Sequence, residues 1–95
     1  MRLTASEVTA IREEIGCLDS GAEIFLFGSR VDDAARGGDI DLLVFSDKLG
    51  FRDELRLRAR ILDRIGWQQL DLVLRRRNEM DEPLAAIARQ TGIKL

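Results

Sequence analysis

Two aspartates and a glycine–serine pair are the residues whose types and spacing suggest chemistry. They lie in segment 23–42, EIFLFGSRVDDAARGGDIDL, where one apolar run ends at Gly28-Ser29 and a second carries Asp39 and Asp41. Because side chains alternate faces along a strand, both carboxylates would leave one face about 6.6 Å apart. Such a pair can bind divalent ions, since Mg²⁺ prefers carboxylate and phosphate oxygens. The alternative is an exposed strand face that carries two acids.

Gly28 and Ser29 follow the first apolar run directly. Free backbone N–H groups at such a turn can point at phosphate, and glycine lets the backbone approach it closely. The same pair is also an ordinary turn at the end of a strand. Arg30 and Arg36 either assist phosphate binding or are solvated, and we favour a binding role for Arg30.

A third acid, Asp71, interrupts the apolar run from Leu70 to Leu74. A carboxylate there is costly to desolvate unless metal or hydrogen bonds stabilise it. The alternative is an edge-strand acid that faces water. Asp63, Glu79 and Asp81 are weaker candidates, because they fall on predicted helices or loops.

The arrangement resembles the minimal nucleotidyltransferase (MNT) branch of the DNA polymerase beta-like nucleotidyltransferase superfamily. In that branch a hydrophobic strand runs into Gly-Ser, and an Asp-hydrophobic-Asp triplet follows after a spacer. Here nine residues separate Ser29 from Asp39. The length of the chain predicts one domain over residues 1–95. The resemblance implies an α/β (α+β) fold, a small mixed sheet of about three strands backed by helices.

The resemblance also implies roles for individual residues. Asp39, Asp41 and Asp71 would hold two Mg²⁺ ions, and Asp71 would also help to deprotonate the acceptor hydroxyl. Gly28, Ser29 and Arg30 would bind the triphosphate of ATP.

MNT proteins of this size resemble the antitoxin half of two-gene systems. Their partner is a helical HEPN protein, a toxin ribonuclease that the MNT enzyme inactivates by adenylylation. We therefore expect transfer of AMP from ATP to a hydroxyl of a HEPN-type partner within a hetero-oligomer. Two alternatives stay open: a non-catalytic module that neutralises a partner by stoichiometric binding, and a nucleotide sensor that binds ATP without turning it over.

The amino-acid composition excludes several other classes of protein as the identity of this chain. The chain has no histidine, which excludes Ser-His-Asp and Cys-His nucleophiles and His-ligated zinc. Cys17 is the only cysteine, so no internal disulfide can form and a reduced, cytoplasmic setting is expected. No apolar stretch approaches the ~20 residues of a membrane span.

Charge is distributed unevenly along the chain. Residues 1–48 contain 5 basic and 10 acidic side chains, and residues 49–95 contain 10 basic and 7 acidic ones. This split suits an acidic half that holds metal and a basic half that faces an anionic substrate or partner, or it is ordinary solvated surface. Arg75, Arg76 and Arg77 could contact a partner, an RNA or a phosphate, but we expect them to be solvated. Direct nucleic-acid binding is not expected.

The pattern predicts six elements. They are helix 5–17 after a capping box at Thr4, strands 23–27 and 39–45, helix 51–65 ended by Gly66, strand 70–74, and helix 81–90. On helix 51–65 we expect an apolar stripe formed by Phe51, Leu55, Leu62 and Ile65 with Leu57 and Ile61 beside it. We expect Trp67 in the core, the alternative being a role in stacking on a base. A crossover through this helix would make strands 39–45 and 70–74 parallel, which brings Asp71 near the other two acids.

Overall fold

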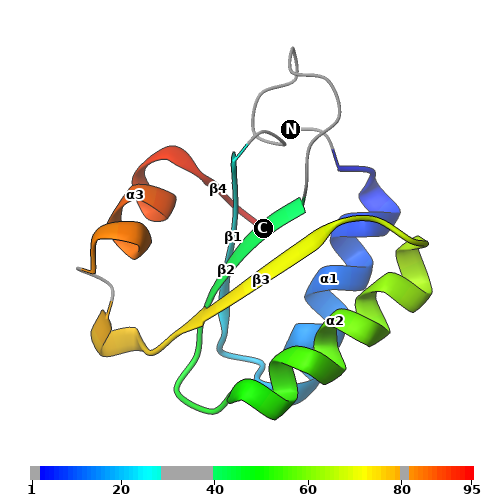
Figure 1. Ribbon diagram of the computed structural model, residues 1–95, viewed down its shortest axis with the longest axis horizontal. Coiled ribbons are helices and arrows are strands. Elements are labelled where there is room, and N and C mark those ends of the chain that lie inside the picture. The colour runs from blue at the N-terminus through cyan, green and yellow to red at the C-terminus, as the bar shows by residue number, and fades with distance from the viewer. Residues whose placement is uncertain (1–2, 29–39, 80–81) are drawn as a thin grey trace.

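A computed structural model describes residues 3–28, 40–79 and 82–95 of the chain. Its elements follow in the order α1 (Ala5–Leu18), β1 (Glu23–Phe27), β2 (Ile40–Phe45), α2 (Phe51–Ile65), β3 (Leu70–Arg75), the 3₁₀ turn η2 (Arg77–Glu79), α3 (Pro83–Thr91) and β4 (Ile93–Lys94) (Figure 1). The predicted α/β fold is confirmed, and the predicted elements agree with the observed ones to within two residues.

The capping box predicted at the start of α1 is present. The Thr4 side chain accepts a hydrogen bond from the Glu7 backbone N–H at 3.1 Å, and the Glu7 carboxylate accepts one from the Thr4 N–H at 2.9 Å. Two of the free N–H groups at the helix start are satisfied in this way. The sequence therefore fixes where α1 begins.

The sheet has four strands rather than the expected three, in the order β3-β2-β1-β4. β1 pairs antiparallel with β2, and β2 pairs parallel with β3, as the crossover through α2 predicted. The additional strand, β4, pairs antiparallel with β1 over only two residues. A strand this short has no periodicity of its own, which is why the sequence pattern does not reveal it.

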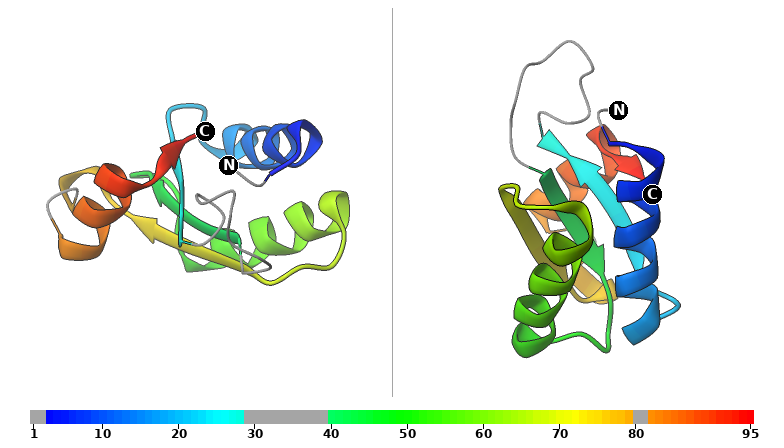
Figure 2. Two further views of the ribbon diagram at one scale, coloured as in Figure 1. Left: turned by 90° about the horizontal axis from the view of Figure 1, so that it is seen from above. Right: turned by 90° about the vertical axis from the view of Figure 1, so that its right-hand side faces the viewer.

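Both faces of the sheet carry helices (Figure 2). α1 and α2 cover one face, where the larger cluster of buried side chains includes Ile11, Leu42 and Ile61. α3 lies on the other face and packs Ala85 and Ala88 against a smaller cluster. In the parts of the chain that the structure describes, no helix has the length and apolar character that crossing a bilayer requires.

The apolar face of α2 differs from the prediction. Leu57 and Ile61 are its fully buried residues, whereas Phe51 and Leu55 are 72% and 50% exposed. α1 packs against one side of α2, and there Arg64 donates hydrogen bonds to Glu13 and Glu14 at 2.7 and 3.1 Å. The expected stripe of apolar residues therefore divides into a buried face and an uncovered flank.

The expectation that Trp67 lies in the core is wrong, because its side chain is 89% exposed. The preceding residue, Gly66, ends α2 with a φ of 87°. This left-handed conformation turns the chain away from the helix axis before β3 begins. Trp67 lies on that turn, outside both clusters of buried side chains.

A buried hydrogen bond joins the two loops at the end of the sheet opposite to Gly28. The Ser46 hydroxyl donates to the Asp19 carboxylate at 2.5 Å, and Asp19 also accepts from the Gly21 N–H at 3.0 Å. The Ser46 oxygen in turn accepts from the N–H groups of Lys48 and Leu49. The hydrogen bond from Ser46 is the main cause that lowers the pKa of Asp19 below its ordinary value, against the opposing effect of burial.

This network predicts a pH-dependent contribution to stability. Because the pKa of Asp19 is lower in the folded state, the carboxylate stabilises the fold above its ordinary pKa, and the contribution disappears as the pH falls through the folded value. Asp19→Asn should lower the free energy of unfolding by about 1–2 kcal/mol at pH 7. Denaturant titrations from pH 7 to pH 3 should show this difference shrinking. The exposed Asp63→Asn serves as control, and a constant difference at all pH values would contradict the assignment.

Candidate active site

The pairing between β2 and β3 brings two of the predicted acids together. In this parallel ladder Asp41 is the register partner of Asp71. Neighbouring strands lie about 4.8 Å apart, and register partners project from the same face of a sheet. Asp41 is partly buried and Asp71 is exposed. The two carboxylates therefore share one face, with Asp71 on the solvent side.

A residue of β1 lies in the same row across the sheet as Asp41 and Asp71. Phe27 is the register partner of Asp41 on the antiparallel side, so Phe27, Asp41 and Asp71 form one row across three strands. The next row, Phe25, Leu43 and Val73, belongs to the apolar cluster beneath α3. Phe25 packs edge-to-face on Phe45, with ring centroids 5.8 Å apart. The acids thus lie beside the apolar patch that α3 covers.

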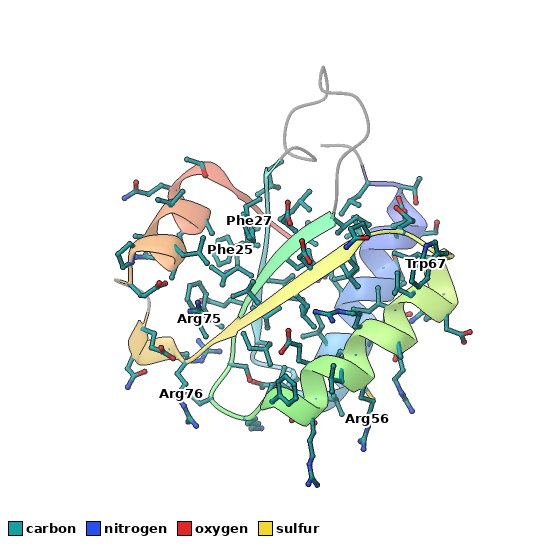
Figure 3. The ribbon with its side chains drawn as sticks, in the orientation of Figure 1. Phe25, Phe27, Arg56, Trp67, Arg75 and Arg76 are labelled. Carbon is teal, nitrogen blue, oxygen red and sulfur yellow. The ribbon has the colours of Figure 1, made fainter. Side chains whose placement is uncertain are left out.

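Phe27 ends the first apolar run but is not among the residues predicted for the site. The signal for it was present in the sequence, because alternation along 23–27 assigns Phe25 and Phe27 to one face. What the sequence does not contain is the register that places Phe27 beside Asp41. Figure 3 shows both phenylalanines extending from β1.

Gly28 lies directly against one of the acids. It has a φ of 77°, and a Cβ built on it would collide with Oδ2 of Asp41. Only glycine combines this backbone conformation with so close an approach of the chain to a carboxylate. The end of β1 is therefore in contact with Asp41. A phosphate and a metal ion bound side by side would need a backbone turn and a carboxylate this close together.

The remaining predicted residues of the site are Ser29, Arg30 and Asp39, and they lie outside the described residues. Within the described ranges 3–28, 40–79 and 82–95, no group of three or more His, Cys, Asp or Glu side chains is arranged to hold a metal ion. Asp41 and Asp71 nevertheless present the hard oxygen donors that Mg²⁺ prefers. Two adjacent carboxylates on a half-exposed face suit a bound cation.

The weaker acidic candidates lie elsewhere. Asp63 is exposed on α2, and Glu79 accepts a hydrogen bond from the Arg76 N–H at 2.9 Å in the 3₁₀ turn η2. Asp81 lies outside the described residues. Neither Asp63 nor Glu79 belongs to the row that contains Asp41 and Asp71.

The three consecutive arginines have separate environments. Arg75 ends β3 and lies 3.6 Å from the Glu82 carboxylate, and Arg76 is exposed. The Arg77 backbone N–H donates to Asp47 at 3.1 Å, while its guanidinium donates to the Gly21 carbonyl. These three arginines therefore lie largely at the surface. The hydrogen bonds of Arg77 join η2 to the loops next to β1 and β2.

Comparison with known families agrees with this geometry. Residues 8–89 match the family described as Nucleotidyltransferase domain, which spans most of the chain. The protein therefore belongs to the nucleotidyltransferase domain family. Curated proteins offer no match to the chain.

The contact between Gly28 and Asp41 gives a prediction about stability. Gly28→Ala should be more destabilising than Gly66→Ala, because both positions have a positive φ but only the first meets a carboxylate. A positive φ costs a residue that has a Cβ about 1–3 kcal/mol at each position, and at Gly28 alone the added methyl group must also displace the Asp41 carboxylate. Denaturant unfolding of the two variants measures the difference.

A double variant isolates the contact itself. Adding Asp41→Ala to Gly28→Ala should recover the part of the loss that exceeds the Gly66→Ala value, since the colliding oxygen is removed. Equal losses for Gly28→Ala and Gly66→Ala, with no recovery in the double variant, would show that the end of β1 does not abut Asp41.

Proposed function

We propose that this protein transfers a nucleoside monophosphate, AMP from ATP, to a hydroxyl group of an acceptor in a Mg²⁺-dependent reaction. The observation that carries the proposal is the register pairing of Asp41 with Asp71 beside the backbone of Gly28, in a chain of the nucleotidyltransferase domain family. The proposed ligands of the metal are these two aspartates together with Asp39.

In the proposed reaction the acceptor oxygen attacks the α-phosphorus of ATP. A new bond to that phosphorus forms as the bond to the bridging oxygen breaks, and pyrophosphate leaves. Bound Mg²⁺ would neutralise the phosphate charge and the leaving group. Asp41 and Asp39 would hold the cation, while Asp71 would complete the site and take the proton of the attacking hydroxyl.

The other proposed contacts hold the triphosphate. The positive φ of Gly28 turns the backbone at the end of β1, next to Asp41. Backbone N–H groups at such a turn can donate to phosphate oxygens, and Ser29 and Arg30 would add a hydroxyl and a positive charge. Most of the rate enhancement would then come from positioning and from charge neutralisation.

We further propose that the acceptor belongs to a HEPN-type partner toxin, which adenylylation inactivates within a hetero-oligomer in the cytoplasm. This part rests on the resemblance of the sequence to MNT antitoxins. The exposure of Asp71 supports it, because an acceptor hydroxyl carried by another protein can approach this carboxylate from solvent. The chain contains no tyrosine, so a tyrosine acceptor would come from the partner.

Transfer of radiolabel tests the reaction. With ATP labelled on its α-phosphate, Mg²⁺ and the protein that co-purifies with this chain, we expect label on the partner. Asp41→Asn and Asp71→Asn should each lower the rate by roughly 100-fold or more, because each removes charge stabilisation worth several kcal/mol. Asp63→Asn is the matched control, since this exposed acid lies on α2 away from the paired acids, and its rate should equal that of the unmodified protein.

The same samples separate the competing functions. If the Asp41→Asn variant still neutralises the partner, the protein acts by stoichiometric binding rather than by catalysis. If ATP binds but no label moves under any metal or partner condition, the protein is a nucleotide sensor. Either result would refute the proposed transfer.

A further inference from the structure

Trp67 is exposed, although hydrogen bonds hold the turn that carries it. It is 89% exposed, more than the other large apolar residues that the structure describes. The Gln68 side-chain amide donates to the Glu7 carboxylate at 2.8 Å, and the Gln69 carbonyl accepts from the Ile40 N–H at 2.9 Å. These bonds attach the turn to α1 and to β2. The indole ring is therefore presented to solvent from a backbone that is fixed in place.

One pocket joins Trp67 to the candidate active site. Trp67 and Asp71 both line it, together with Arg58 and Leu62 of α2, and its volume is about 230 Å³. Pockets that enclose a whole small molecule usually measure about 300–1,000 Å³. This pocket is smaller than that range, so it suits a single side chain of a larger molecule better than a complete small-molecule acceptor.

The two sides of the candidate active site differ. The Gly28 backbone meets Asp41 from the β1 side, whereas Asp71 lies on β3, which is the last strand of the sheet on the other side. Because the proposed triphosphate site is on the β1 side, the β3 side is left for the acceptor. Figure 3 shows Trp67 beside the start of β3, at the opposite end of this strand from Arg75. An acceptor that approaches Asp71 from the β3 side therefore passes Trp67.

Arg58 gives the same pocket a positively charged wall. Its Nε is buried and has no hydrogen-bond partner among the residues that the structure describes. Its Nη2 lies 3.4 Å from the Glu54 carboxylate, which is longer than most hydrogen bonds. Buried polar groups in proteins are usually paired. A carbonyl or carboxylate oxygen brought into the pocket would therefore find a donor in this guanidinium.

We propose that Trp67 is a specificity-determining residue for the acceptor. The occupant of its pocket is a polypeptide segment of the partner protein, which places an apolar side chain against Trp67 and Leu62 and an oxygen atom near Arg58. The acceptor hydroxyl on the same segment then reaches Asp71. This inference rests on the proposed transfer reaction, and it assigns Trp67 to binding of the acceptor and not to the bond-making step.

Kinetics of label transfer to the co-purifying protein test this role. Trp67→Ala should raise the KM for that protein about tenfold or more, because a tryptophan at the centre of a contact often dominates binding. The KM for ATP and the kcat at saturating partner should stay unchanged, and Trp67→Phe should recover part of the loss. Phe51→Ala is the matched control, since it removes another exposed aromatic ring, which lines a different pocket near the end of β3.

Fluorine NMR tests the contact without catalysis. Trp67 is the only tryptophan, so a chain made with 5-fluorotryptophan has one fluorine resonance. Adding the unlabelled co-purifying protein without ATP should shift or broaden this resonance, whereas ATP with Mg²⁺ alone should leave it unchanged. The Asp71→Asn variant should give the same response to the partner, because docking does not require transfer.

The outcomes separate this role from the reaction itself. If the unmodified chain moves label but Trp67→Ala, folded as judged by circular dichroism, has the same KM for the partner, only the role of Trp67 is refuted. A raised KM for ATP alone, or a fluorine resonance that answers to ATP, would place Trp67 at the nucleotide instead. An unchanged resonance in a complex whose mass includes the partner would also refute the contact. If the unmodified chain moves no label under any condition, the proposed reaction fails, and the role of Trp67 fails with it.

Discussion

The parallel, in-register pairing of β2 with β3 is the constraint on which the site depends. It places Asp41 opposite Asp71, although thirty positions separate them in the chain. A shift of one residue would send Asp71 to the other face, into the apolar cluster beneath α1 and α2. The apolar residues that alternate with the acids prevent this shift, because Ile40, Leu42 and Leu72 are buried on that face.

Local patterns predicted the elements well because each pattern has a local physical cause. The capping box at Thr4, the glycine that ends α2 and the alternation along 70–74 each specify a backbone conformation without help from distant residues. The parallel orientation of β3 followed from the crossover through α2. The approach of Asp71 to Asp41 was therefore predictable, and the structure brings these two residues together.

Other features depend on which neighbour covers which surface, and no local pattern contains that information. The apolar residues of α2 predict that one face of this helix is buried against the sheet. α1 packs against only one side of α2, however, and Phe51 and Leu55 are left exposed. Trp67 is large and apolar, which favours the core, yet the left-handed turn at Gly66 takes it outward. β4 forms only because α3 returns the chain to the free edge of β1.

The helix α3 covers only part of its face of the sheet. Its alanines pack over Phe25, Leu43 and Phe45, while Asp71 in the neighbouring row is exposed to solvent. Alanine has a short side chain, so the helix sits low against the strands and does not extend over the acids as a lid would. Among the residues that the structure describes, α3 therefore leaves the Asp71 side of this face within reach of a large molecule.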